Sequence, residues 1–416
     1  MTLEQSISVS ERCQMGGERT LVISINQDYC SRCSICYSVC PYEAVKRDAE
    51  TGKVEIDVQK CQVCGICYSA CPVFAVEILY YDYESLLGYV EEMRGKIGAE
   101  TLVLMCRGNS PSTREVEEIL TEQGLSLKSY IPLRLPCSGR VPTEFIFKVL
   151  GLGIKNVVSI QCEDLFCRFK EGTKINTRRL FLGRRVLEDL GFDKDAVRVV
   201  KYSRKVVYDT LKCVGCDKCV FICPYAAIEA DHFATPKILY DYCMGCGACA
   251  LVCPHNAIQL KGFEFENVLK RYCDSAVRLK AEGKSPLILV FCCQWSEFSA
   301  LDNPEGILFK RNAITLEIPC FKALDPVHVV NALMNGFDGV MAVVCSAEDC
   351  KLQEGRDTAE RNMTVLKDFL KKVGLLERFA LFEASPRNFG GFEEKLDEFL
   401  KKISALSSKK PLKEAT

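Results

Sequence analysis

The sequence has 416 residues, of which 48% are hydrophobic, and its formal net charge is −1. This length predicts several domains with packed cores, and the near-neutral charge argues against nucleic-acid binding, which needs a clustered basic surface. No apolar run approaches the roughly 18 residues of a membrane span, and the first residues contain no apolar signal segment. We therefore expect a cytoplasmic protein without direct membrane insertion.

The cysteine content indicates the class of protein. The chain contains 27 cysteines. A disulfide scaffold would be short and secreted, so this many thiols in a long chain without an export signal indicates metal binding, redox chemistry or both. Such a protein tolerates oxygen poorly, and we expect an anaerobic host.

The pattern C-x2-C-x2-C-x3-C-P occurs four times, at 30–41, 61–72, 213–224 and 243–254. This spacing wraps a loop around a cubane [4Fe–4S] cluster, and the fourth cysteine ligates the neighbouring cluster. Zinc is the alternative, but zinc sites usually pair two separated CxxC elements. The pattern therefore predicts four [4Fe–4S] clusters with crossed ligand sets, which are Cys30, Cys33, Cys36 and Cys71; Cys61, Cys64, Cys67 and Cys40; Cys213, Cys216, Cys219 and Cys253; and Cys243, Cys246, Cys249 and Cys223.

A second domain is predicted after each motif pair, behind a linking helix at 83–100 or 263–283. Strand and helix patterns alternate in it, which favours a small α/β domain with a mainly parallel sheet. The predicted strands are 101–106, 127–137, 156–162 and 196–203 in one copy, and 286–293, 313–320, 339–345 and 378–385 in the other. The fold class is thus α+β ferredoxin-like domains alternating with small α/β domains. The expected boundaries are a flexible leader at 1–19, a ferredoxin domain at 20–82, an α/β domain at 83–203, a ferredoxin domain at 204–262, an α/β domain at 263–404 and a polar tail at 405–416.

The α/β domains carry cysteines at strand ends, where open α/β sheets place their ligands. One candidate set is Cys106, Cys137, Cys162 and Cys167; the other is Cys320, Cys345 and Cys350 with Cys293 or Cys292. Buried cysteines are often only small hydrophobic residues, but their recurrence at matched positions favours metal. Four thiolates from separated strand ends suit a [2Fe–2S] cluster, so we expect one or two of these.

An internal two-fold repeat accounts for this layout. Cys30 and Cys167 recur as Cys213 and Cys350 at the same separation, and the intervening cysteines follow to within one residue apart from a small slip near Cys106. We interpret the chain as a tandem duplication of a ferredoxin domain fused to a second domain.

The second domains resemble the delta (iron–sulfur) subunit of methyl-viologen-reducing hydrogenase. The matching pieces are CQW at 293–295, CSGRV at 137–141, CEDLFC at 162–167 and CSAEDC at 345–350. The sequence departs from the family at CRG (106–108), at CFKAL (320–324) and at Ser296. The resemblance implies a [2Fe–2S] cluster and electron transfer from a hydrogenase or formate dehydrogenase to a heterodisulfide-reductase-type flavoprotein.

Catalytic and nucleotide-binding motifs are missing from the sequence. No G-x-G-x-x-G follows a predicted strand, no P-loop is present, and the three histidines have no metal-type spacing. We therefore predict a non-catalytic electron-transfer subunit of a hetero-oligomeric redox complex, with no flavin or NAD site. Two alternatives stay open: a disulfide- or sulfur-reducing enzyme, suggested by the Cys292–Cys293 pair, and an iron–sulfur cluster carrier.

Overall fold

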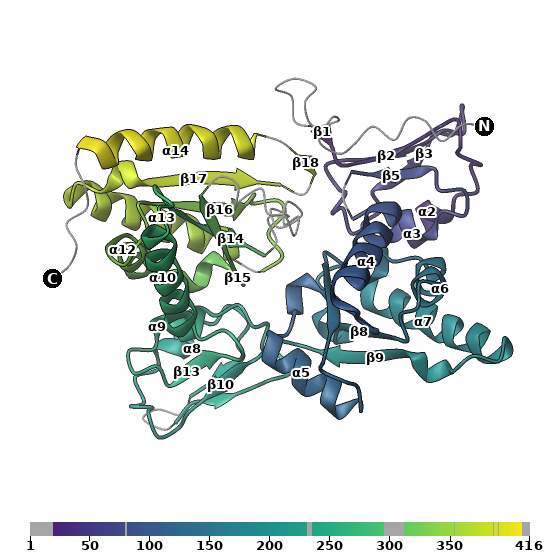
Figure 1. The fold of residues 1–416 in the computed structure, drawn as a ribbon, viewed down its shortest axis with the longest axis horizontal. Helices are drawn as coiled ribbons and strands as arrows, with labels where there is room; N and C mark the ends of the chain where they lie inside the picture. The colour runs from purple at the N-terminus through teal and green to yellow at the C-terminus, as the bar shows by residue number, and fades with distance from the viewer. Residues whose placement is uncertain are drawn as a thin grey trace. The chain divides into compact units, whose positions relative to one another are not determined.

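The computed structural model describes residues 20–79, 81–230, 235–294, 312–352, 354–385, 387–389 and 391–409. The predicted leader at 1–19, Trp295, Ser296 and residues 410–416 lie outside these described residues. The chain forms two compact units, coloured purple to teal and teal to yellow in Figure 1. Unit 1 comprises Met1–Ser110, Glu117–Tyr202 and Pro386–Gly391, and unit 2 comprises Pro111–Val116, Ser203–Ser385 and Phe392–Thr416.

Unit 1 begins with a ferredoxin-type part made of two short helices and antiparallel strand pairs. Strand β2 pairs with β5 and β3 pairs with β4, while β1 pairs with β18 from the other end of the chain. The bounds are β1 Thr20–Leu21, β2 Ile23–Ile25, α2 Ile35–Val39, β3 Val45–Arg47, β4 Val54–Ile56, α3 Ile66–Ala70, β5 Val76–Ile78 and β18 Asn388–Phe389.

A parallel four-stranded sheet with the order β7-β6-β8-β9 forms the rest of unit 1. Its elements are α4 Tyr83–Ile97, β6 Thr101–Cys106, α5 Thr113–Glu122, β7 Tyr130–Leu135, α6 Thr143–Gly151, β8 Asn156–Cys162, α7 Gly172–Asp189 and β9 Val197–Tyr202. Apolar side chains of α4, α6 and α7, such as Val90, Phe145 and Leu180, pack against apolar side chains of the sheet. The predicted parallel sheet is confirmed, whereas helix α5 was not predicted from the sequence.

Unit 2 has the same two kinds of part. Its ferredoxin-type elements are β10 Val206–Tyr208, α8 Lys218–Ile222, β11 Ile228–Glu229, β12 Lys237–Ile238, α9 Ala248–Val252 and β13 Ile258–Leu260. Its parallel sheet has the order β15-β14-β16-β17. The bounds there are α10 Phe265–Ala281, β14 Ile288–Cys293, β15 Ala313–Ile318, α12 Pro326–Met334, β16 Gly339–Cys345, α13 Gly355–Lys372, β17 Phe379–Ala384 and α14 Phe392–Lys409.

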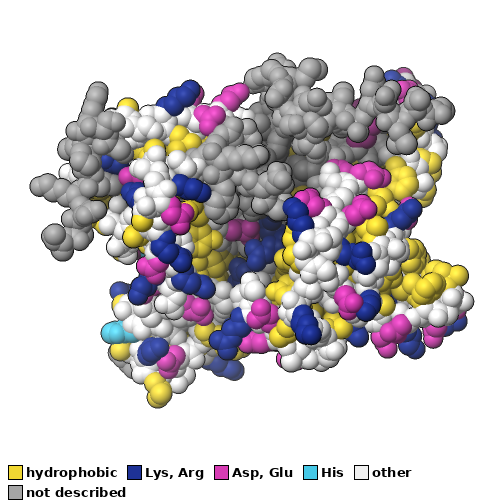
Figure 2. All heavy atoms as spheres, in the orientation of Figure 1, with side chains coloured by type: hydrophobic (Ala, Val, Ile, Leu, Met, Phe, Trp, Pro, Cys, Tyr) yellow, Lys and Arg dark blue, Asp and Glu magenta, His cyan; other side chains and the backbone are white. Residues whose placement is uncertain are grey.

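Helix α14 covers one face of the second sheet. Its residues Phe392, Leu396, Phe399 and Ile403 are buried against β14 and β16. The helix extends past the start of the stretch 405–416 that we expected to be a tail. Within the described residues, no helix is long and apolar enough to cross a membrane. On the face shown in Figure 2, acidic and basic side chains are interspersed.

Both sheets place a topological switch point at the centre. After β6 the chain adds β7 on one side and then β8 on the other, and β14 to β16 repeat this order. Ligands of open α/β sheets bind beyond the carboxyl ends of the strands at such a point. Cys106 and Cys162 are the last residues of β6 and β8, so the cysteines of the α/β part end at this crevice.

Candidate metal centres

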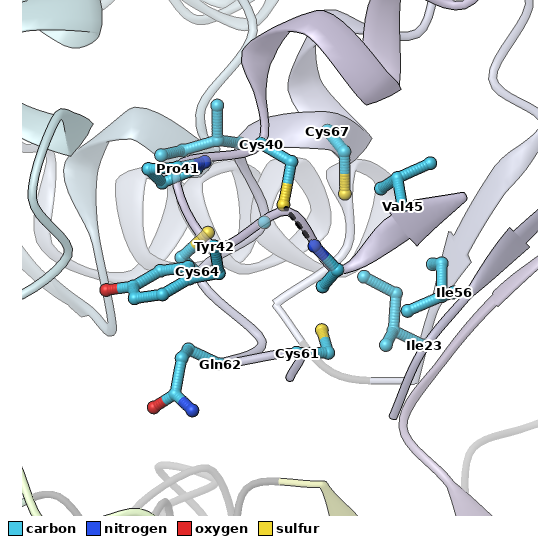
Figure 3. Close-up of a pocket in the computed structure, with 13 residues that line it drawn as sticks. Ile23, Cys40, Pro41, Tyr42, Val45, Ile56, Cys61, Gln62, Cys64 and Cys67 are labelled. Atoms are coloured by element: carbon cyan, nitrogen blue, oxygen red, sulfur yellow. Dashed lines mark hydrogen bonds between the residues drawn. The ribbon is translucent and has the colours of Figure 1, made fainter. Parts of the chain in front are cut away.

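Four cavities lie in the ferredoxin-type parts, and each is lined by four cysteines. The cysteines of each cavity come from both motifs of one ferredoxin-type part, three from one motif and the last from the other. Figure 3 shows Cys40, Cys61, Cys64 and Cys67 gathered around one of them. The other three cavities bring together Cys30, Cys33, Cys36 and Cys71; Cys213, Cys216, Cys219 and Cys253; and Cys223, Cys243, Cys246 and Cys249. Each group contains the same cysteines as one of the crossed sets derived from the spacing.

The four cysteine loops share an unusual backbone. In each loop the second residue after the first cysteine and the residue after the second cysteine have positive φ, as Val63 and Gly65 do in the second loop. The equivalent residues are Arg32 and Ser34, Gly215 and Asp217, and Gly245 and Gly247. Left-handed residues turn the chain sharply, which bends each loop around its cavity and starts the short helix that follows.

A second fourfold feature follows each proline. The residue three positions after the last cysteine of each motif, such as Glu43, again has positive φ. The next residue is a buried alanine whose backbone N–H donates to that cysteine sulfur: Ala44 to Cys40 at 3.4 Å, Ala75 to Cys71 at 3.2 Å, Ala227 to Cys223 at 3.4 Å and Ala257 to Cys253 at 3.2 Å. Figure 3 marks the first of these bonds. These alanines line the cavities, and their backbone N–H groups supply donors to sulfur, which iron–sulfur sites use to set their potential.

The donor set fits a cubane cluster. Apolar side chains such as Ile23, Val45 and Ile56 surround the thiols of the cavity in Figure 3. Among the described residues, no three His, Cys, Asp or Glu side chains converge as a single metal ion would need. Zinc thiolates lie roughly 3.8 Å apart, given Zn–S bonds of about 2.3 Å, whereas these cysteines stand around a cavity.

The two cavities of each unit differ in exposure. Cys33 and Cys216, each in the first motif of its unit, are exposed, whereas Cys64 and Cys67 in the second motif of unit 1 are buried. Burial raises the pKa of the Cys64 thiol to about 12, while the pKa of Cys33 is lowered by the backbone N–H of Ile35. We call the exposed cavities distal and the buried ones proximal.

In the α/β part of unit 1, four cysteines gather at the switch point. Cys106 and Cys162 end neighbouring strands, and a hydrogen bond from the Cys162 thiol lowers the pKa of Cys106. The Sγ of Cys106 also lies 3.1 Å from the hydroxyl oxygen of Ser138. The charges of Cys106 and Cys167 act on Cys137, whose pKa is raised by burial. The predicted set Cys106, Cys137, Cys162 and Cys167 is therefore together in space.

The amino end of helix α7 completes this site. Gly172 begins the helix, and a Cβ placed there would lie 2.4 Å from the Sγ of Cys137. The backbone N–H of Thr173 donates to the Sγ of Cys167 at 3.4 Å. Free N–H groups and the helix dipole favour thiolates at this position. The helix was predicted from the sequence, but this role of Gly172 was not.

Unit 2 repeats the arrangement with its own residues. The Sγ atoms of Cys293 and Cys345 are 4.0 Å apart at the ends of β14 and β16. A Cβ at Gly355, the first residue of α13, would lie 2.7 Å from the Sγ of Cys350 and 3.4 Å from that of Cys320. Four cysteines thus meet here as well.

Cys292 takes a different position. Successive side chains of a strand point to opposite faces, and Cys292 packs in the apolar core with Met341 and Phe399 beneath α14. Of the two cysteines, Cys293 is the one whose sulfur lies beside that of Cys345, so we take Cys293 for the proposed ligand set and leave Cys292 out.

Each α/β site adjoins the proximal cavity of its unit. The charge of Cys64 acts on Cys137, and that of Cys246 acts on Cys320. Tyr42 lines the proximal cavity of unit 1. Burial raises the pKa of its hydroxyl, and the charges of Cys64 in the proximal site and Cys137 in the α/β site raise it further. In unit 2, Cys246, Cys320 and Cys350 belong to one packed cluster with Tyr225. The distal cavity, the proximal cavity and the α/β site therefore form a series of decreasing exposure in unit 1.

Comparisons with known proteins agree with this architecture. The family model for the methyl-viologen-reducing hydrogenase delta subunit matches residues 103–213 and 288–407, together more than half of the chain. Models for 4Fe–4S dicluster domains match residues 22–72 and 206–260.

Two kinds of relative are similar to parts of the chain. The iron-sulfur subunit of the F420-non-reducing hydrogenase of Archaeoglobus profundus is 30% identical over 122 residues, which are 29% of this chain and 89% of that protein. A subunit of the ferredoxin/F(420)H(2)-dependent CoB-CoM heterodisulfide reductase of Methanosarcina acetivorans is 29% identical over 128 residues, or 30% of this chain. The matched part spans only 16% of that second relative.

The fold and the cysteine sites define an iron–sulfur protein with ferredoxin-type [4Fe–4S] domains. Within that class, the chain belongs to the methyl-viologen-reducing hydrogenase delta subunit family.

Proposed function

We propose that this chain is a non-catalytic electron-transfer subunit of an anaerobic, cytoplasmic redox complex. It relays single electrons between a hydrogenase- or formate-dehydrogenase-type partner and a heterodisulfide-reductase-type flavoprotein. The observation that carries the proposal is the series of cysteine sites in unit 1, from the exposed distal set through the proximal set to the α/β site. By name, its relatives belong to a hydrogenase and to a heterodisulfide reductase, which supports a multi-subunit complex.

Four [4Fe–4S] clusters and one or two [2Fe–2S] clusters are proposed for this chain. The crossed sets around the four cavities would hold the cubanes. The α/β ligands would be the set of Cys106, Cys137, Cys162 and Cys167, and the set of Cys293, Cys320, Cys345 and Cys350. Such clusters change by one electron at a time, so a flavin in a partner would supply the conversion to two-electron chemistry.

The residues of the chain give the relay its properties. Exposed Cys33 and Cys216 bring the distal sites to the surface, where a partner can exchange electrons. Buried Cys64 and Cys67 keep the proximal site of unit 1 away from water. The Tyr42 ring lines the proximal site there, and the charges of Cys64 and Cys137 both act on it.

The domain boundaries and the duplication belong to the same proposal. Both units carry a ferredoxin-type part followed by a parallel sheet of the same strand order, and the family model matches once in each half. This supports a tandem duplication with the boundaries expected from the sequence. The reductase alternative was suggested by the Cys292–Cys293 pair, and Cys292 packs in the apolar core beneath α14, which favours the relay.

A direct test uses the purified chain under anaerobic conditions. Reduced methyl viologen should reduce its chromophores, and a heterodisulfide-reductase-type flavoprotein should reoxidise them. The chain alone, given the dye and a disulfide, should show no turnover. Steady disulfide reduction by the chain alone would contradict the proposal and favour the enzyme alternative, and transfer of its clusters to apo-proteins would favour the carrier.

A further inference from the structure

Buried positive charge is concentrated beside the proximal and α/β sites of unit 1. Arg140 is 0% exposed and Arg107 is 2% exposed. The guanidinium carbons of Arg140 and Arg107 lie 5.8 Å and 5.5 Å from the centroid of the same Tyr81 ring. Two guanidinium groups are thus held inside unit 1 on one tyrosine ring, although burying a charge costs free energy.

Arg140 is held against the proximal cysteine loop. The Arg140 guanidinium donates a hydrogen bond to the carbonyl oxygen of Val63. Its side chain also packs on Gly65, where an added Cβ would lie 2.5 Å from the Nε of Arg140. Val63 and Gly65 flank Cys64 in the sequence. Burial raises the pKa of Cys64 to about 12, and the charge of Arg140 opposes that rise.

Arg179 adds a third cation on the same side. Its Nη1 donates to the hydroxyl of Ser69 at 2.5 Å and to the carbonyl of Gly139 at 2.8 Å. Its pKa is lowered by burial and raised by the charge of Cys137, which places the guanidinium near the α/β site. The cations of unit 1 therefore act on both sites.

Counting from the cysteines and from the first residues of α7 and α13 gives the matching positions in unit 2, where these cations are replaced. Gln294 follows Cys293 where Arg107 follows Cys106, and Asn362 in α13 matches Arg179 in α7. Ala323 takes the place of Arg140 and packs on Gly247 as Arg140 packs on Gly65. A Cβ added at Gly247 would lie 2.9 Å from the Cβ of Ala323. Lys322, 2% exposed, is a buried cation in this region, and it acts on Cys246.

Unit 2 also carries acidic groups where unit 1 has none at the matching positions. Asp349 is 1% exposed, accepts hydrogen bonds from Ser346 at 2.5 Å and Ser385 at 2.6 Å, and precedes Cys350 as Phe166 precedes Cys167. In the sheets, Glu383 pairs in register with Val344, as Lys201 does with Gln161. Glu383 forms an ion pair with Arg356 at 2.8 Å, and Lys201 forms one with Asp164 at 2.7 Å, so both of these cations are offset and the difference between the units rests on the buried arginines.

Reduction adds one electron to a cluster site, and a fixed positive charge nearby stabilises the more negative, reduced form. Resting on the proposed function, we propose that the buried arginines give the proximal and α/β sites of unit 1 a higher reduction potential than the matching sites of unit 2. Electrons that equilibrate over the chain therefore collect in unit 1, and unit 2 is the low-potential end. The departure from the family at CFKAL (320–324) then has a physical meaning, because Ala323 stands where unit 1 has Arg140.

The test is a mediated redox titration of the anaerobically purified full-length chain, followed by EPR and visible absorbance. Arg140→Gln removes the charge but keeps a long polar side chain, and Arg140→Lys retains a charge. Lys322→Gln is the equivalent loss in unit 2, and Arg185→Gln on the exposed side of α7 is the matched control. Iron and sulfide are counted in every variant, so that loss of clusters is separated from a change in potential.

We expect components at two potentials in the wild type. Arg140→Gln should lower the potential of the higher component and reduce its reduced-to-oxidised ratio about tenfold at the wild-type midpoint, as expected for a unit charge at low effective dielectric constant. Arg140→Lys should keep most of the wild-type potential of the higher component. Lys322→Gln should lower the potential of the lower component alone, and Arg185→Gln should change neither potential. Full clusters with one common potential, or a lower component that moves in Arg140→Gln, would overturn the inference and leave the proposed relay intact. A chain without cubane signals would instead overturn the proposed function.

Discussion

Gly172, the first residue of α7, has no side chain and so leaves space for the Sγ of Cys137. A Cβ at Gly172 would lie 2.4 Å from that Sγ, well inside van der Waals contact, and the helix fixes the glycine backbone. The same relation holds for Gly355 with Cys350 at 2.7 Å. A methyl group at either position must therefore displace a candidate ligand.

The first prediction concerns this glycine. Gly172→Ala should remove the α/β cluster of unit 1, a loss of about two irons per chain, and leave the cubane EPR signals unchanged. Gly183→Ala is the matched control on the same helix, since its Cβ would lie 3.5 Å from Thr143, an ordinary contact. Equal iron content in the two variants would show that Cys137 is not a ligand.

Two adjacent cysteines provide the second prediction. Cys293→Ala should lose the α/β cluster of unit 2, because its sulfur lies 4.0 Å from that of Cys345. Cys292→Ala should keep every iron and lose roughly 1 kcal/mol of stability from a small core cavity. Iron counting and thermal unfolding of both variants check this, and the opposite pattern would place the ligand at Cys292.

The sequence could predict which residues bear chemistry, but not all that surrounds them. The cysteine spacing predicts which cysteines group together, because the geometry of a cluster constrains the spacing of its ligands. The buried Arg107 and Arg140 leave no comparable signal, since arginine is usually exposed and its burial depends on tertiary contacts with Tyr81 and Val63.

Among the elements, strands of the parallel sheets were the most predictable. Buried parallel strands are continuous apolar runs, and the predicted 101–106, 156–162 and 339–345 coincide with β6, β8 and β16. Helix α14 was missed, although Phe392, Leu396, Phe399 and Ile403 recur at helical spacing. The many charged residues between these apolar positions are typical of a solvent-exposed segment. The helix packs because its apolar residues cover a face of the second sheet, which the sequence alone does not reveal.

Helix α12 gives the third prediction, a pH dependence. His328 stacks on Phe265 with ring centroids 3.9 Å apart, and its Nδ1 accepts the backbone N–H of Asp325 at 3.0 Å in a capping box. Burial lowers its pKa to about 4 from 6.5. As pH falls, the imidazole of the unfolded chain is therefore protonated before that of the folded chain. The contribution of His328 to stability is present above pH 6.5 and is lost as pH falls toward 4.

His328→Gln keeps a capping side chain without this titration. We expect the wild type to lose more stability than the variant between pH 7 and pH 5, measured by urea unfolding followed by circular dichroism. Equal losses in the two proteins would mean that the imidazole can be protonated in the folded chain.

At the scale of the whole molecule, two units carry the same series of sites in different electrostatic surroundings. Each unit holds a distal cavity, a proximal cavity and an α/β site. The sequence repeat predicts this layout because both halves keep the cysteines. It does not predict the difference in buried charge, since residues such as Arg140 and Ala323 acquire their meaning only from what they contact.

The measurement that tests the account most directly is anaerobic counting of iron and sulfide in the purified chain, paired with EPR during stepwise reduction. The account predicts four cubanes and loaded α/β sites, which is about twenty irons with a [2Fe–2S] signal beside the [4Fe–4S] signals, or about eighteen if one α/β site is loaded. About sixteen irons with cubane signals alone would contradict it. The cysteines at the sheet ends would then be structural, and the chain would be a double ferredoxin.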